Sequence, residues 1–371
     1  MQLLSLLLDN PGDTTQSGKM NTSNSTSCEP VHPTAHIFFI SIYSLIFLVG
    51  LFLNGFTLRV YFCRPQRRAS SSVTIYLKNL AASDFLISLC LPIRIMNYAS
   101  NSVDIRLVYC NFGASAFYLN MYASIMFMGY IAANRYIKII HPLGNHTLLK
   151  TRTAFIISIA TWSVLVAMTI TYMILSLSTQ ERQDHLPGMV SCDVLHSKQL
   201  NVLYKVIHCF SGIIFIFFLA SLVYLYNRTS HRLAQAQENQ PASSSSKKLA
   251  KSRRNMLVLV SVFCVCFVPY HLVRLPYAFM KHIWCSFSWF FYLKEMTIVV
   301  SVLNVCLDPL IYFIFCKAFR AQMSLKPESN TVQVASEATV MERRSSEGRQ
   351  SFLKNPRKLS LPLSTSPTDV L

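Results

Sequence analysis

Residues 117–143 read FYLNMYASIMFMGYIAANRYIKIIHPL. Apolar side chains dominate the stretch up to Arg135, and Tyr136, Lys138 and His141 then follow within a few positions. About 20 helical residues are enough to cross the roughly 30 Å hydrocarbon core of a bilayer. The stretch therefore predicts a transmembrane helix, with Arg135 at the end where the helix leaves the membrane.

Similar apolar runs recur along the chain. Of its 371 residues 52% are hydrophobic and only 13% are charged, which is too apolar for an ordinary soluble protein of this length. We predict an all-α membrane protein: a seven-transmembrane helix bundle with a short amphipathic helix after the last span. The expected spans cover residues 37–62, 73–98, 107–134, 153–177, 201–227, 255–280 and 289–313.

The distribution of basic residues predicts how the chain is oriented. Most of the 34 Lys and Arg residues follow the first, third, fifth and seventh spans, and such segments are retained in the cytosol. We therefore expect an extracellular segment over 1–36, a membrane domain over 37–322 and a disordered cytoplasmic tail over 323–371. The basic residues behind the net charge of +18 lie mostly in the predicted cytosolic segments. This placement fits a membrane protein, so we expect no nucleic-acid partner.

Glycosylation and disulfide formation are both expected on the extracellular side of the membrane. Asn21 and Asn24 begin glycosylation sequons in the predicted extracellular segment. Four cysteines also fall on this side and predict two disulfides, for which three pairings are open. These cysteines are Cys28, Cys110, Cys192 and Cys285.

The chain lacks motifs that are typical of enzymes and of transporters. The sequence contains no P-loop, no GxSxG and no HExxH, so we expect no enzyme activity. It has no matching halves with broken helices, which makes a transporter the lesser alternative.

Polar side chains inside predicted spans are costly and indicate a functional site. Two pairs have i,i+4 spacing, which places each pair on one helix face. Such a cluster can hold a small hard cation such as Na⁺ or can serve only for hydrogen bonds between helices, and the spacing does not decide between them. The cluster consists of Asp84, Asn120, Ser124, Asn304 and Asp308.

Several motifs together resemble those of the rhodopsin-like (class A) G-protein-coupled receptors, over about residues 37–322. The motifs are Asn54, LAASD at 80–84, Cys110, Asn134-Arg135-Tyr136, Trp162, CFVP at 266–269, Asn304 and DPLIY at 308–312. The resemblance implies a plasma-membrane receptor for a heterotrimeric G protein, with arrestin and receptor kinases as partners of the tail. It also implies an allosteric Na⁺ at the polar cluster, no cofactor, and the disulfides Cys110–Cys192 and Cys28–Cys285.

By the same resemblance, Arg135 is the inner end of an activation switch. In that family this Arg helps to receive the C-terminal helix of the G protein, while Tyr224 and Tyr312 swing in to stabilise the open state. The implied switch residues are Asn134, Arg135, Tyr136, Tyr224, Phe267, Pro269, Asp308, Pro309 and Tyr312.

Asn134 departs from the family pattern, which has Asp or Glu before the Arg. An acid restrains the Arg by an ion pair, whereas an amide offers only a weaker hydrogen bond. We hypothesise that the chain has raised basal activity.

Local stretches resemble the purinergic-like group, which includes the ADP and UDP-sugar receptors and a lysophosphatidylserine receptor. They are IYLKN at 75–79, LPIRI at 91–95, FYLNMY at 117–122, FVPYHLVRLPY at 267–277 and LKEMT at 293–297. Basic side chains near the outer ends of spans suit an anionic, phosphate-bearing small ligand, and tyrosines can stack on it. The expected ligand-binding residues are Arg94, Tyr118, Tyr122, Tyr270, His271, Arg274, Tyr277 and Lys294.

Other interpretations of these residues stay open. Arg94 and Lys294 can reach lipid headgroups, with the tyrosines forming an interfacial belt, and Glu295 can offset part of the positive charge. The resemblance implies a nucleotide or nucleotide-sugar receptor coupled to Gi/o, with a lysophospholipid receptor as the alternative. A non-signalling or constitutively active orphan receptor is a third alternative. In the fifth span the group's usual His and Asn are replaced, and Tyr204, Lys205 and His208 are the nearest polar residues.

Overall fold

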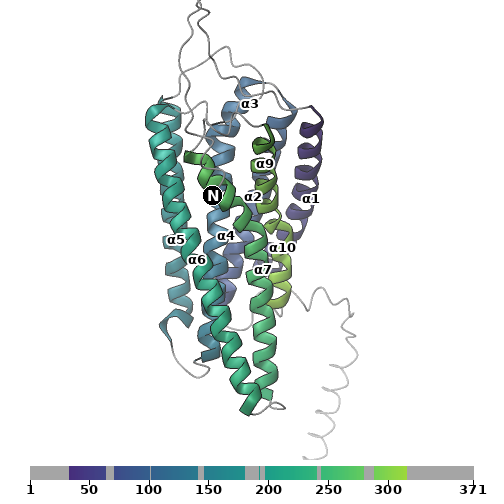
Figure 1. Ribbon diagram of the computed structural model, residues 1–371, viewed down its shortest axis with the longest axis vertical. Helices are drawn as coiled ribbons and strands as arrows, with labels where there is room; N and C mark the ends of the chain where they lie inside the picture. The colour runs from purple at the N-terminus through teal and green to yellow at the C-terminus, as the bar shows by residue number, and fades with distance from the viewer. Residues whose placement is uncertain are drawn as a thin grey trace, which may run out of the picture. The chain divides into compact units, whose positions relative to one another are not determined.

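The computed structural model describes residues 33–63, 71–100, 102–140, 146–179, 192, 197–239, 244–279 and 288–315. Within these ranges, seven helical segments are long and apolar enough to cross a membrane (Figure 1). The predicted all-helical, seven-span fold class is confirmed.

Five spans are single helices: α1 (Pro33–Cys63), α2 (Ser72–Ala99), α5 (Thr151–Thr179), α6 (Lys198–Asn239) and α7 (Ser244–Phe279). The third span begins with α3 (Val103–Val108), passes through a π-helical turn (Tyr109–Gly113) and continues as α4 (Ala114–Ile140). A turn at Leu303 divides the seventh span into α9 (Ser288–Val302) and α10 (Asn304–Phe315). A short 3₁₀ turn (Thr147–Leu149) precedes α5.

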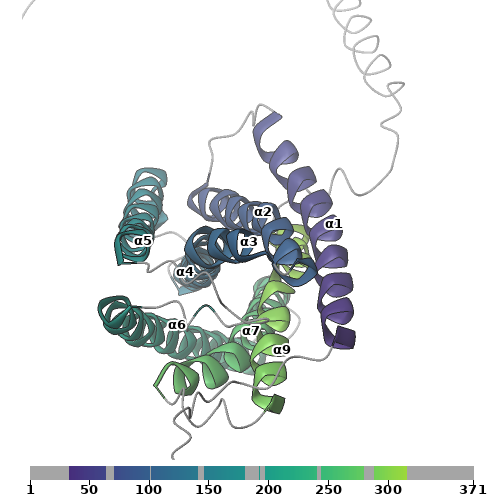
Figure 2. The same ribbon diagram turned by 90° about the horizontal axis from the view of Figure 1, so that it is seen from above.

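The helices pack around α4. It contacts α2, α5, α6 and α7, while α1 packs on α2 and α10 at one side of the bundle (Figure 2). Residues that are distant in the sequence can therefore meet at either end of the bundle.

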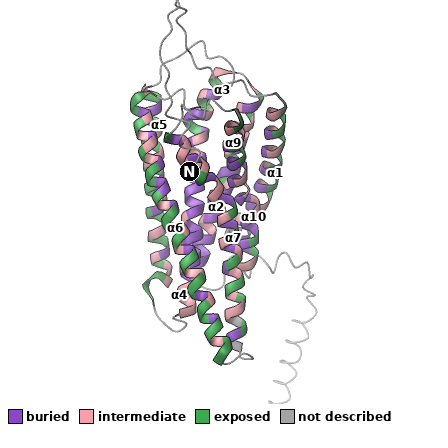
Figure 3. Ribbon diagram, in the orientation of Figure 1, coloured by how far each residue is buried: buried purple, intermediate pink, exposed green. Residues whose placement is uncertain are grey.

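The exposure of side chains is that of a protein whose solvent is lipid. Large apolar side chains lie on the outside, with Phe52 73% and Leu272 69% exposed. Buried residues line the inward faces of the helices (Figure 3), and Asn54, Asp84 and Asp308 are fully buried among them. Polar groups placed inside a bundle need partners within it, and these partners define the sites described below.

Pro309 shows how one such partner arises. Proline has no N–H and cannot bond the carbonyl four residues earlier in its helix, here that of Val305. The Asn54 side chain donates to this carbonyl at 2.9 Å, which ties α1 to α10. The Asn in the first span and the Pro in the seventh therefore support each other.

The segment 229–254 lies between the fifth and sixth predicted spans and carries the helical-looking stretch RLAQAQENQ, and most of it is helical in the structure. Helix α6 continues to Asn239 and α7 begins at Ser244. Thr229 and Leu233 on α6 and Met256 on α7 are buried, and the Thr229 hydroxyl lies 3.4 Å from the Met256 sulfur. The expectation that this segment could not bury a core was wrong, because Thr229 and Leu233 are buried.

Some sequence predictions lie outside the described residues. They are the amphipathic helix after the last span, the boundary at residue 322, the tail, the sequons at Asn21 and Asn24, and the Cys28–Cys285 pairing.

Candidate functional site

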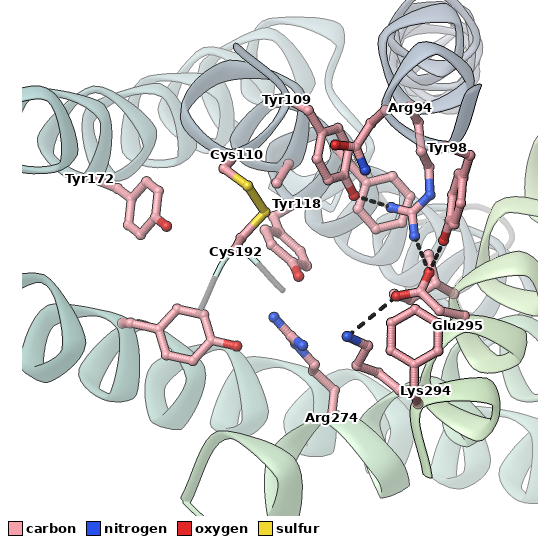
Figure 4. Close-up of a pocket in the computed structure, with 16 residues that line it drawn as sticks. Arg94, Tyr98, Tyr109, Cys110, Tyr118, Tyr172, Cys192, Arg274, Lys294 and Glu295 are labelled. Carbon is pink, nitrogen blue, oxygen red and sulfur yellow. Dashed lines mark hydrogen bonds and ion pairs between the residues drawn. A yellow bond between two sulfur atoms is a disulfide. The ribbon is translucent and has the colours of Figure 1, made fainter. Parts of the chain in front are cut away.

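A cavity opens among α2, the third span, α6, α7 and α9, and it encloses about 760 Å³ including its open mouth. Three basic side chains that the sequence singled out, Arg94, Arg274 and Lys294, all line it (Figure 4). They come from α2, α7 and α9 and are at most 8% exposed. The structure therefore brings together three cations from distant parts of the chain.

Arg94 is fixed by several contacts at once. Its Nη1 donates to the Tyr109 hydroxyl at 2.6 Å and its Nη2 to Glu295 Oε2 at 2.7 Å. The Tyr98 hydroxyl donates to the same carboxylate oxygen. The guanidinium also lies 4.8 Å from the centre of the Tyr43 ring, a cation–π distance. Arg94 is therefore part of a buried ion pair rather than a side chain that reaches lipid headgroups.

The other two cations lie against aromatic rings. The Arg274 guanidinium is 5.5 Å from the centre of the Tyr204 ring and 5.2 Å from that of Tyr277. The Lys294 ammonium lies 5.0 Å from the same Tyr277 ring and 3.3 Å from Glu295 Oε1. In Figure 4 the charged ends of Arg274 and Lys294 both point into the cavity. Tyr277 thus contacts both cations and helps to position them.

A disulfide joins Cys110 to Cys192 with an S–S distance of 2.02 Å. Both cysteines line the cavity opposite Arg274 and Lys294. This pairing, implied by the family resemblance, is confirmed.

A second cavity of about 720 Å³ lies between α4, α5 and α6, and its wall is mainly apolar. It shares Ala114, Tyr118, Tyr172 and Tyr204 with the cationic cavity, so the two cavities adjoin at these residues. Of the polar residues expected in the fifth span, Tyr204 lines both cavities, His208 lines the second and Lys205 lines neither.

The remaining expected ligand residues lie deeper. Tyr122 lines the second cavity and its hydroxyl is 3.1 Å from His271 Nε2. His271 also stacks on Phe215, with ring centres 3.7 Å apart, and Tyr270 is buried beside it. Tyr270 and His271 line neither cavity, and each packs on a tyrosine that does, Tyr270 on Tyr118 and His271 on Tyr122.

The polar cluster in the middle of the bundle centres on Asp84. Asp84 Oδ1 accepts from Ser124 at 3.2 Å and from Asn304 at 3.3 Å, and Oδ2 accepts from Tyr312 at 2.6 Å. The Asp308 side chain contacts the Asp84 carboxyl. The structure thus brings together five polar side chains from the second, third and seventh spans.

Acceptor oxygens outnumber donors in this cluster. Asn120 Oδ1, Asn304 Oδ1 and both carboxyl oxygens of Asp308 are buried without a hydrogen-bond donor among the described residues. Buried acceptors and two adjacent carboxyls require a proton or a cation. Hard cations prefer oxygen ligands, so the residues present fit a small cation.

The inner end of the third span carries Asn134 and Arg135. Asn134 Nδ2 donates to Ser72 Oγ at 2.7 Å, so its amide is directed toward α2. Arg135 Nη2 donates to the Phe315 carbonyl at 3.3 Å, and the guanidinium lies 4.6 Å from the centre of the Phe315 ring. Arg135 is thus held at the C-terminal end of α10.

The two tyrosines expected to move on activation have different surroundings. Tyr312 is buried and bonded to Asp84, whereas the Tyr224 side chain on α6 points outward and is 57% exposed. Phe267 and Pro269 lie on α7, where Phe267 is fully buried. Tyr136 follows Arg135 on α4.

Sequence reasoning missed two residues of the outer site, Tyr98 and Tyr109. Both hydroxyls bond the Arg94–Glu295 pair. Tyr98 lies one helical turn after Arg94 on α2, a spacing that could have been noticed. Tyr109 lies in the π-helical turn, which no pattern in the sequence announces.

Comparisons with known proteins give consistent results. A family model described as "7 transmembrane receptor (rhodopsin family)" matches residues 53–312. The chain is 33% identical over 315 residues to purinoceptor 14 of Bos taurus, with 81% of this chain and 91% of the relative covered. It is 30% identical over 332 residues to G-protein coupled receptor 87 of Mus musculus, with 86% and 90% covered. Identity is also 30% over 306 residues to probable G-protein coupled receptor 34 of Mus musculus, with 81% and 79% covered.

Proposed function

Because the chain belongs to the rhodopsin-like (class A) family of seven-transmembrane receptors, in its purinergic-like branch, we propose that it binds an extracellular phosphate-bearing ligand, a nucleotide or nucleotide sugar, and signals through Gi/o. Family membership makes it a G-protein-coupled receptor with small-molecule ligands rather than an enzyme, and a multi-pass protein of the plasma membrane. The proposal also includes the identity of the ligand, coupling to the Gi/o class, arrestin and receptor kinases as partners, and an extracellular N-terminus.

The convergence of Arg94, Arg274 and Lys294 on one cavity carries the ligand proposal. Guanidinium and ammonium groups bind phosphate by charge-assisted hydrogen bonds, which strengthen where water is excluded. The surrounding tyrosines give a base or sugar surfaces on which to pack. One of the similarities to known proteins supports the same ligand class, since a relative with 33% identity is named a purinoceptor.

A Gi-activation assay in cells tests this proposal. Wild type and Arg274→Ala are challenged with ADP, UDP-sugars and lysophosphatidylserine. Lys205→Ala is the matched control, because Lys205 is a neighbouring cation that lines neither cavity. We expect a nucleotide response that Arg274→Ala loses and Lys205→Ala keeps, while an equal nucleotide response in all three would contradict the assignment.

The second cavity favours the lysophospholipid alternative. A lysophospholipid carries a phosphate and one acyl chain, and the apolar cavity adjoins the cationic one across Tyr118, Tyr172 and Tyr204. Met168→Trp would fill the apolar cavity. If the ligand is a lysophospholipid, this substitution abolishes its response; if the ligand is a nucleotide, the response persists.

The polar cluster is proposed to bind Na⁺ through Asp84, Asn120, Ser124, Asn304 and Asp308. A bound cation would offset the adjacent carboxylates and hold the spans together around them. We expect NaCl to stabilise the purified receptor more than KCl at equal ionic strength, and Asp84→Asn to remove the difference. Equal melting temperatures in the two salts for wild type would contradict the site.

The third alternative is a constitutively active receptor. Asn134 bonds Ser72 and leaves Arg135 without an acidic neighbour in the sequence, which supports raised basal signalling. Silence toward all the tested ligands together with high basal Gi activity would favour this alternative.

A further inference from the structure

Helices α6 and α7 extend well beyond the membrane at the inner end of the bundle. They have 42 and 36 residues, whereas about 20 helical residues cross the hydrocarbon core. Both run past the neighbouring helices at this end (Figure 1). The first part of α7, SSSKKLAKSRRN at 244–255, is strongly basic, and α7 has no Asp or Glu along its whole length. The positive charge is therefore not offset within the helix.

Both helices place the membrane boundary at the same level. On α7 the polar sequence ends at Asn255 and apolar sequence begins at Met256. On α6 the apolar sequence gives way to Asn227 and Arg228. The Thr229 hydroxyl lies 3.4 Å from the Met256 sulfur, so the two transitions are side by side. Cationic side chains close to this level lie at the depth of the lipid headgroups.

Three cations of α7 lie on one exposed face of the helix. Lys247, Lys251 and Arg254 are exposed, and their spacing of four and three residues places them in one row. Continued by whole turns of the helix, this row reaches Val265 and Leu272, whose side chains are 56% and 69% exposed. Exposed apolar side chains of a membrane span face lipid. The three cations therefore lie on the lipid side of α7.

The opposite face of α7 points into the bundle. Met256, Leu259 and Phe263 on that face are at most 1% exposed. A protein partner that enters between the helices meets this inward face, whereas the three cations face the surrounding membrane. Their position therefore favours a lipid headgroup as the partner.

We propose that Lys247, Lys251 and Arg254, here called the basic stripe, bind a polyphosphoinositide of the inner leaflet. At 1.5 Å per residue the basic stripe covers about 10 Å along the helix axis. Phosphatidylserine presents a single net charge close to the boundary. The inositol ring of a polyphosphoinositide carries further phosphates at increasing distance from it, and these match cations at successive depths. The site is separate from the outer cavity, and it rests only on the proposed orientation, which puts this end of the bundle in the cytosol.

The test measures binding of fluorescent dioctanoyl phosphatidylinositol bisphosphate to the purified full-length receptor in detergent micelles, by fluorescence anisotropy. Wild type is compared with Lys247→Gln/Lys251→Gln/Arg254→Gln. A cation near an anionic lipid surface contributes about fivefold in affinity, so we expect the triple variant to bind about a hundredfold more weakly. Dioctanoyl phosphatidylserine should bind wild type at least about tenfold more weakly than the phosphoinositide.

Arg253 provides a matched control for Arg254. It is also exposed and lies at nearly the same depth, but it points about 100° away around the helix. We expect Arg254→Gln to lose about fivefold in affinity and Arg253→Gln less than about twofold. Because the substituted side chains are exposed, all variants should keep the melting temperature of wild type. The two single variants provide the measurement if the triple variant fails to fold.

Soluble inositol trisphosphate distinguishes the lipid from its phosphorylated headgroup alone. It should compete at least about tenfold more weakly than unlabelled dioctanoyl lipid, because the basic stripe continues into apolar surface of α7 that acyl chains can cover. Equal competition by the soluble compound would overturn the assignment to a membrane lipid.

Four other results would overturn the inference. These are equal phosphoinositide affinity in wild type and the triple variant, equal losses in Arg253→Gln and Arg254→Gln, and phosphatidylserine bound as tightly as the phosphoinositide. The fourth is a triple variant that keeps lipid binding but loses G-protein activation in phosphatidylcholine nanodiscs, because the basic stripe would then serve a protein partner. None of them bears on the outer cavity, whose proposed ligand is tested separately by Arg274→Ala.

Discussion

Two arginines, one near each end of the bundle, are held in opposite ways. Arg94 near the outer end has an acidic partner, a tyrosine hydroxyl and a close aromatic ring. Arg135 near the inner end has the backbone carbonyl and the ring of Phe315, and its neighbour Asn134 bonds Ser72. Ion pairing fixes a side chain far more firmly than a neutral acceptor does. The difference leads us to expect that changes at the outer end act mainly on stability and changes at the inner end mainly on signalling.

The largest expected effect comes from breaking the outer pair. Arg94→Ala removes the cation that pairs with Oε2 of the buried Glu295 and leaves Lys294 as the cation beside Oε1, which we expect to cost about 3 kcal/mol of stability. Thermal denaturation and surface expression of the receptor measure this loss. Arg94→Gln/Glu295→Gln should recover most of it, and a single variant as stable as wild type would show that the pair does not brace the outer end.

The corresponding change at the inner end should affect signalling and leave stability nearly intact. Arg135→Ala removes the hydrogen bond to the Phe315 carbonyl and the contact with the Phe315 ring, and these two contacts together are worth about 1 kcal/mol. We expect G-protein activation to be lost while the melting temperature stays close to that of wild type. A destabilisation as large as that of Arg94→Ala would abolish the contrast between the two ends.

Giving the inner end an acidic partner should make it resemble the outer one. Asn134→Asp places a carboxylate beside Arg135, and we expect basal Gi activity to fall about three- to tenfold at equal surface expression. Ser72→Ala is the control, because it removes the hydrogen-bond partner of Asn134 without adding charge. Unchanged basal activity in Asn134→Asp would refute the idea that the inner arginine is weakly restrained.

The smallest expected effect comes from the ring that covers Arg135. Phe315→Ala keeps the backbone carbonyl but removes a cation–π contact of about 0.5–1 kcal/mol, so basal activity should rise about two- to fivefold. Phe313→Ala, at a 45% exposed position of the same helix, provides the comparison. An equal rise in both variants would show that the effect is general to α10 rather than specific to Arg135.

The sequence predicted the spans well because the bilayer imposes a simple signal, a long apolar helix. It did not give the full length of α6 and α7, because both helices continue beyond the apolar runs into charged and polar sequence. It identified Arg94, Arg274 and Lys294 by type and position, and it noted that Glu295 could offset positive charge. The pairing of Arg94 with Glu295 could not be predicted, because the two residues are 201 positions apart and only the folded bundle brings them together.

Phosphate binding in the outer cavity underlies the proposed ligand. Saturation binding of radiolabelled ADP, UDP-glucose and lysophosphatidylserine to membranes that contain wild type, Arg274→Ala, Lys294→Ala or Lys205→Ala tests it most directly. We predict that at least one probe binds wild type and Lys205→Ala equally and loses at least about tenfold in affinity in both cavity variants. Equal binding of that probe to all four receptors, or no binding of any probe to wild type, would contradict phosphate binding in this cavity.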